Sequence, residues 1–216
     1  ESFNDSSKMV NIIDVLNFLT LSGVNIVSIE LGNELYYYQQ YTWLLKGSPN
    51  AAERIKLGKT TKAIEASVLN NVSKLVEHLK KVSKLLRDNG YNQPLGVGVS
   101  APVAMRERLF TQAIVQDNSY YDFIAPHIYV EDASEKGIMS AVNSVLSSLP
   151  KGIEKRVTEF NFNYQANPKG HSFTNEQVLR SFEKAFKQNG VDGYYFHCLW
   201  NRMDINGYSV NVLPNR

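Results

Sequence analysis

Apolar residues recur along the chain with a helical period and a strand period in turn. Helical spacing predicts amphipathic helices, and short β-branched runs that are apolar on both faces predict parallel strands covered on each side. The expected helices are Ser7–Ser22, Thr61–Asp88, Val103–Gln116, Glu135–Leu149 and Asn175–Asn189. The expected strands are Asn25–Leu31, Leu95–Val99, Phe123–Val130, Arg156–Phe162 and Gly193–Leu199. Gly23 and Asn89-Gly90 are expected to end the first two helices.

This alternation demands a parallel sheet, and both a doubly wound sheet and a (β/α)8 barrel satisfy it. A doubly wound nucleotide binder needs a glycine-rich turn, and the nearest candidate, Gly96-Val97-Gly98, lies inside an expected strand. Four of the five strands end in a polar or aromatic cluster, which is where barrel enzymes place their chemistry. The fold class is therefore predicted to be α/β, a (β/α)8 TIM barrel.

Composition excludes several classes of protein. The chain has 216 residues, 23 Lys and Arg against 21 Asp and Glu, and 43% hydrophobic residues, which describes a globular domain. The basic stretch from Lys74 to Arg87 alternates with leucine and valine at helical spacing, so we interpret it as a solvated helix face that also exposes His78. We expect neither nucleic acid nor a membrane as a partner, because the net charge is only +2 and no apolar run reaches about 18 residues.

The sequence shows no pattern that predicts a disulfide, a metal site or a Ser-His-Asp triad. The single cysteine, Cys198, excludes an internal disulfide. Asp, His and Cys show no metal-ligand spacing, and no Ser-His-Asp set stands out, so we expect no metal and no cofactor.

Two glutamates stand at strand ends. Glu34 follows the first strand and Glu159 lies on the fourth, and in a barrel both ends converge on one face. Glycosidic bond cleavage needs two facing carboxyl groups, one protonated and one ionised. A single glutamate at such a place is more often a solvated loop residue or an ion-pair partner, so the coincidence of several residues carries the interpretation.

The pattern of polar and aromatic residues at the strand ends resembles that of the clan A glycoside hydrolases. These are retaining enzymes with a TIM-barrel fold. The resemblance rests on Asn33-Glu34, a His-x-Tyr at His127 and Tyr129, Thr158-Glu159, and Trp200. The stretch Glu30 to Glu34, with the sequence ELGNE, is similar to that of heparanase-like glucuronidases and arabinofuranosidase-type enzymes. In this family the acid/base glutamate lies on the fourth strand and the nucleophile on the seventh.

The resemblance implies catalytic roles. Glu34 is the general acid/base and Glu159 the nucleophile. Asn33 hydrogen-bonds the sugar 2-hydroxyl, unless it serves only as a turn residue after Gly32. Tyr129 donates to Glu159 and keeps it ionised, unless it is only a buried amphipathic side chain.

Substrate-binding roles follow in the same way. His127 contacts substrate or orients a neighbour. Trp200 offers a flat face for a sugar ring, with packing at the barrel mouth as the alternative. Tyr36 begins an aromatic cluster in the loop after Glu34 that either stacks on a polysaccharide or packs the loop down. The other members of this cluster are Tyr37, Tyr38, Tyr41 and Trp43.

By the resemblance, the five strands correspond to the fourth to the eighth of a barrel. We expect residues 1–216 to be the C-terminal portion of a single catalytic barrel, completed by an N-terminal half-barrel from the same gene product or another chain. The expected function is retaining hydrolysis of a polysaccharide or oligosaccharide. The alternative is a non-catalytic carbohydrate-binding barrel domain or an inactive fragment. An extracellular or periplasmic location is favoured over the cytoplasm.

Overall fold

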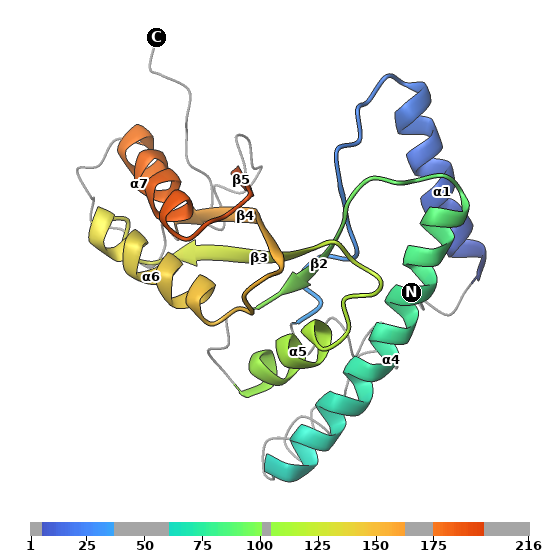
Figure 1. Ribbon diagram of the computed structural model, residues 1–216, viewed down its shortest axis with the longest axis horizontal. Coiled ribbons are helices and arrows are strands. Elements are labelled where there is room, and N and C mark those ends of the chain that lie inside the picture. Colours follow the sequence, from blue (N-terminus) through green and yellow to red (C-terminus); the bar gives the residue numbers. More distant parts are fainter. Residues whose placement is uncertain (1–5, 37–60, 101–104, 163–174, 197–216) are drawn as a thin grey trace, which may run out of the picture. The chain divides into compact units, whose positions relative to one another are not determined.

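The computed structural model describes residues 6–36, 61–100, 105–162 and 175–196 (Figure 1). The described strands follow the order β1-β2-β3-β4-β5, with bounds Ile29–Glu30, Leu95–Val99, Phe123–Val130, Glu154–Phe162 and Gly193–Phe196. The helices are α1 (Ser6–Leu21), α4 (Thr61–Asp88), α5 (Met105–Val115), α6 (Glu135–Ser147) and α7 (Asn175–Gln188). Successive strands are neighbours and a helix separates each pair, which is the order of a (β/α)8 barrel and not of a doubly wound sheet. The expected fold class is confirmed.

The chain divides into two compact units, Glu1–Ile124 and Ala125–Arg216, which are described separately. In the first unit, β1 pairs with β2 in parallel, with Ile29 opposite Leu95. The long helix α4 buries one stripe of apolar side chains, namely Val68, Val72, Leu75, Leu79, Val82 and Leu86. Lys74, Lys81 and Lys84 lie on its exposed face. The expected solvated basic face is therefore confirmed.

Glycines end three of the helices with one hydrogen-bonding pattern. Gly23, Gly90 and Gly190 have φ of 79°, 84° and 62°, in the left-handed region that glycine adopts without steric cost. After α4, Gly90 N donates to Arg87 O at 3.0 Å and Tyr91 N donates to Leu86 O at 3.0 Å. These bonds satisfy carbonyls that a helix end leaves without partners. The predicted stops at Gly23 and Asn89-Gly90 are confirmed.

In the second unit, β4 pairs with β5 in parallel, and α6 and α7 lie side by side (Figure 1). Ser134 begins α6, because its hydroxyl accepts a 3.0 Å hydrogen bond from Gly137 N. The core joins α7 to the strands through aromatic rings whose neighbouring centroids lie 4.9 to 6.1 Å apart. The rings are those of Phe160, Phe182, Phe186 and Tyr194. These contacts fix the orientation of β4, the strand that carries Glu159.

Two sequence expectations are wrong. The strand expected over Asn25–Leu31 forms only at Ile29–Glu30, because the pairing with β2 begins there. His78 is buried and not exposed, since it lies beside Leu75 and Leu79 on the core side of α4. Burial, and secondarily the charge of Lys81, lower the pKa of His78. Within the described residues, no helix has the length and apolar character to cross a membrane.

Candidate active site

The turn after β1 carries three of the expected site residues. Leu31 and Leu35 are buried and anchor the turn on either side of Asn33 and Glu34. Leu31 N donates to Gly96 O at 2.8 Å, which ties the start of the turn to β2. Asn33 is exposed and Glu34 is partly exposed, so both polar side chains are accessible to solvent.

Glu34 has a strained backbone. Its φ is 47°, and it is the non-glycine residue with positive φ in the described part of the chain. A side chain in this region costs roughly 1–2 kcal/mol, and such residues concentrate at active sites, where surrounding contacts hold them in place. The strain therefore supports a functional role for the residue that the sequence singled out as the acid/base.

Tyr36 holds Glu34 from within the same turn. Its hydroxyl donates a 3.2 Å hydrogen bond to Glu34 Oε1, and its ring meets Phe110 edge-on at 6.3 Å. Only 5% of Tyr36 is exposed. This geometry favours packing and support of Glu34 over stacking on a sugar, and substrate binding by Tyr36 stays a prediction.

In the second unit, three expected site residues converge. The Tyr129 hydroxyl donates a 2.7 Å hydrogen bond to Glu159 Oε2, and His127 Nδ1 lies 3.5 Å from the same oxygen. The two β3 residues face one side of the sheet because they are two positions apart. The His127 side chain is 1% exposed and that of Glu159 is 21% exposed. The burial of His127 favours a role in orienting Glu159 over a role in contacting substrate. Glu159 itself remains accessible.

Glu159 lies at an irregularity of β4 that the sequence did not indicate. Val157 pairs with Tyr194, whereas Phe160 pairs with Phe196, so β4 carries one extra residue over this stretch. A bulge re-aims side chains and is frequent beside active sites. No glycine marks the position, and no sequence signal could have located it.

The structure does not describe the remaining expected residues. Trp200 lies outside the described residues, as do Tyr37, Tyr38, Tyr41 and Trp43. Because Glu34 and Glu159 belong to different units, their separation stays a prediction.

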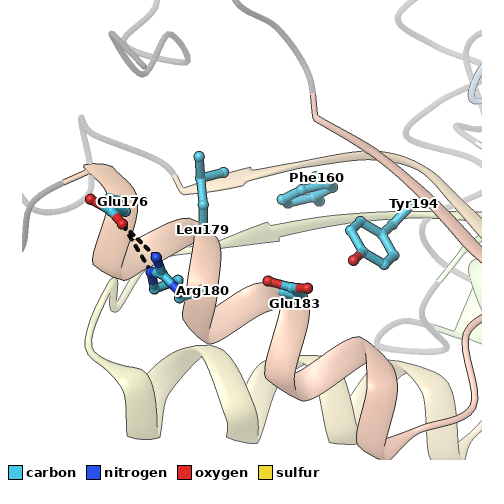
Figure 2. A pocket seen from close by; sticks show the side chains of 6 residues that line it. All are labelled: Phe160, Glu176, Leu179, Arg180, Glu183 and Tyr194. Carbon is cyan, nitrogen blue, oxygen red and sulfur yellow. Dashed lines mark hydrogen bonds and ion pairs between the residues drawn. The ribbon is translucent and has the colours of Figure 1, made fainter. Parts of the chain in front are cut away.

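A pocket of about 510 Å³ lies elsewhere in the second unit, between α7 and the strands β4 and β5 (Figure 2). Phe160 and Tyr194 line its strand side, and the other lining residues are Glu176, Leu179, Arg180 and Glu183 on α7. None of the expected site residues lines this pocket.

The charges around this pocket are paired within α7. Arg180 donates to Glu176 at 2.7 and 3.0 Å, and this bond raises the pKa of Arg180. The hydrogen bond from Lys187 lowers the pKa of Glu183. Such exposed pairs along a helix are ordinary surface features and do not point to catalysis.

No model of a known protein family matches the chain, and no curated protein sequence matches it. Among solved structures, it is similar to the GH53 catalytic domain from Ignisphaera aggregans, with 13% identity and a TM-score of 0.53 over 89% of this chain and 55% of that chain. The chain shares with that domain the fold of part of a (β/α)8 barrel. At this identity the similarity shows the fold alone.

Two arabinofuranosidases are also similar. These are the α-L-arabinofuranosidase from Thermotoga maritima in complex with arabinose (11% identity, TM-score 0.44) and the GH51 α-L-arabinofuranosidase from Thermotoga petrophila RKU-1 (10% identity, TM-score 0.45). Each match covers 77% of this chain and 33% of the other. The chain thus spans between one third and about half of the length of these structures.

Proposed function

We propose that the protein is the catalytic part of a retaining glycoside hydrolase that cleaves O-glycosidic bonds of a polysaccharide or oligosaccharide. The observation that carries this proposal is the group around Glu159, a partly exposed carboxylate that accepts a short hydrogen bond from Tyr129. A nucleophilic carboxylate must be ionised, oriented and open to substrate. The strained turn at Glu34 supports a second functional carboxyl group on the N-terminal unit.

In the proposed mechanism, Glu34 protonates the leaving oxygen while a Glu159 oxygen attacks the anomeric carbon. The glycosidic C–O bond breaks and a glycosyl ester of Glu159 forms. A water molecule then gives a proton to Glu34 and attacks the same carbon, which releases the sugar and restores both carboxyl groups. This double displacement requires the two carboxyl groups to lie roughly 5 to 5.5 Å apart.

The protein's own contacts would support these steps. Tyr129 donates to Oε2 of Glu159, which restricts the orientations that this carboxylate can adopt during the attack. Tyr36 donates to Oε1 of Glu34, which limits the positions that its carboxyl group can adopt. Asn33 is exposed, as a contact with the sugar 2-hydroxyl requires, and such a contact strengthens in the transition state.

Covalent labelling tests the nucleophile. The protein is incubated with a panel of activated 2-deoxy-2-fluoro glycosides, and the modified peptide is identified by mass spectrometry. Glu159 should carry the sugar, Glu159→Gln should abolish labelling, and Glu34→Ala should retain it, because an activated leaving group needs no protonation. Labelling of another residue, or labelling of the Glu159→Gln protein, would overturn the assignment.

The same panel separates catalysis from carbohydrate binding. If a polysaccharide binds with measurable affinity but no fluoro-sugar labels the protein and no reducing ends appear, the chain is a binding domain. If turnover occurs, the anomeric configuration of the first product, followed by NMR, distinguishes retention from inversion. Inversion would contradict the role given to Glu159.

A further inference from the structure

In the second unit, β5 carries two adjacent tyrosines that lie on opposite faces of the sheet. Tyr194 belongs to the face that α7 covers, because its ring centroid lies 5.1 Å from that of Phe186 (Figure 2). Successive side chains of a strand point to opposite faces, so Tyr195 lies on the face away from α7. Tyr195 is 44% exposed there. The strand thus presents an accessible aromatic side chain on the face opposite the helix.

Glu159 lies on the same face as Tyr195. Phe160, the next residue of β4, packs on Phe182 of α7 with ring centroids 4.9 Å apart. Because adjacent strand residues point to opposite faces, the Glu159 side chain points away from α7. The carboxylate and the accessible tyrosine therefore share one surface of the sheet.

The register of β4 and β5 places Tyr195 opposite Glu159 along the strands. The paired positions on either side of the bulge are Val157 with Tyr194 and Phe160 with Phe196. Between these pairs, β5 has Tyr195 alone, whereas β4 has Glu159 and one further residue. Neighbouring strands lie about 4.8 Å apart, which is less than the length of a tyrosine side chain. The Tyr195 ring is therefore within reach of a group bound at the carboxylate.

The two strands beside β4 offer Glu159 different chemistry. From β3, the Tyr129 hydroxyl and the His127 imidazole contact Glu159 Oε2 and restrict the carboxylate. From β5, Tyr195 offers an aromatic ring. A sugar has apolar faces lined by C–H groups and a polar edge of hydroxyls, and a tyrosine ring combines an apolar face with a polar tip in the same way. The ring thus suits a sugar positioned for attack by Glu159.

We propose that Tyr195 is a substrate-contacting residue and that its ring packs on the sugar bound at Glu159. The proposal rests on the proposed function, because it takes the surroundings of Glu159 as the place where the sugar binds. It adds a residue that the sequence pattern did not single out. The contact is made with the bound sugar before and during the attack, so it acts on affinity more than on the rate of the covalent step.

The first test follows labelling by the activated 2-deoxy-2-fluoro glycosides at several concentrations. This separates the dissociation constant of the reagent from the rate constant of the covalent step. Tyr195→Ala should raise the dissociation constant at least about tenfold, because the apolar contact of the ring is lost. Tyr195→Phe keeps the ring and should change the dissociation constant by less than about threefold.

Tyr194→Ala is the matched control, since it removes the same side chain from the other face of the same strand. It should lower the Tm, because the Tyr194 ring packs on Phe160 and Phe186, and it should leave the dissociation constant unchanged. Tyr195→Ala should show the opposite pattern. A role of Tyr195 in packing alone would instead lower the Tm and leave the dissociation constant as it is.

The second test needs no change at Tyr195. The Glu159→Gln protein carries ¹³C-labelled tyrosine rings, and the methyl glycosides of the sugars in the panel are titrated into it. The ring signals of Tyr195, assigned from the spectrum of Tyr195→Phe, should shift on binding, whereas those of Tyr194 should not. This measurement keeps the proposal falsifiable even where Tyr195→Ala fails to fold.

The two tests separate this proposal from the proposed function. If Glu159 is labelled but the Tyr195 signals do not shift, the role of Tyr195 is overturned and the function stands. If no reagent labels Glu159 but a methyl glycoside shifts the Tyr195 signals, the function fails and the sugar contact stands. If no sugar either labels the protein or shifts these signals, both are overturned.

Discussion

The hydroxyl of Tyr129 donates a 2.7 Å hydrogen bond to Oε2 of Glu159, and the two residues lie on strands that are neighbours in the sheet order. A hydrogen bond to a charged group contributes about 1.5 to 3 kcal/mol. Tyr129→Phe removes only the donor. It should lower kcat on aryl glycosides by about 10- to 100-fold, since each 1.4 kcal/mol is a factor of ten in rate.

The control for this change is Tyr194→Phe, because Tyr194 lines the pocket beside α7, which none of the expected site residues lines. Its kcat should equal that of the unmodified protein. Unchanged kcat for a folded Tyr129→Phe protein would mean that Tyr129 serves only to pack the strand.

The strain at Glu34 is expected to appear in the stability of its variants. Glu34→Gly and Glu34→Ala should both lose activity, but Glu34→Gly should be about 1 kcal/mol more stable. Glycine adopts a φ of 47° freely, whereas alanine retains the Cβ that makes it costly. Urea denaturation measures the difference. Equal stability of the two variants would show that the turn is not strained in solution.

Two glycines of β2 form a matched pair. A Cβ at Gly96 would overlap the ring of the fully buried Phe123, whereas a Cβ at Gly98 would lie 3.4 Å from Glu30 Oε1, an ordinary contact. Gly96→Ala should therefore lower the free energy of unfolding by about 1 to 3 kcal/mol, and Gly98→Ala by less than about 1 kcal/mol. The reverse order of Tm values would contradict the packing of β2 against Phe123.

Tyr120 and Tyr121 make stability sensitive to alkaline pH. Burial, followed by the charge of Asp117, raises the pKa of Tyr121 to about 12, and burial raises that of Tyr120 further. In the unfolded chain, the tyrosine hydroxyl ionises near pH 10. The contribution of Tyr121 to the free energy of unfolding is therefore complete below pH 10 and is lost as the pH rises towards 12. This loss is about 2 to 3 kcal/mol for Tyr121.

Tyr121→Phe should reduce that alkaline loss, as measured by urea denaturation between pH 8 and 12. At pH 7 the variant should be at least as stable as the original protein. The reason is that neither buried hydroxyl has a hydrogen-bond partner among the described residues. If the pH dependence is unchanged, Tyr121 is already ionised or solvated in the native state.

The helices and strands and their order follow from local patterns in the sequence. Periodicity is a local property, so α4 and β2 begin and end where the pattern predicts, and Gly23 and Gly90 end their helices as expected. The spacing of His127 and Tyr129 also fixed that both face one side of β3, because strand side chains alternate with a period of two.

The way in which the candidate site residues are held depends instead on packing in three dimensions. The extra residue beside Glu159, the positive φ of Glu34 and the burial of Tyr36 against Phe110 depend on contacts between segments far apart in sequence. A local pattern does not specify such contacts. The length of β1 also depends on a contact between distant segments. A strand with suitable composition forms only where a neighbouring strand accepts and donates its backbone hydrogen bonds.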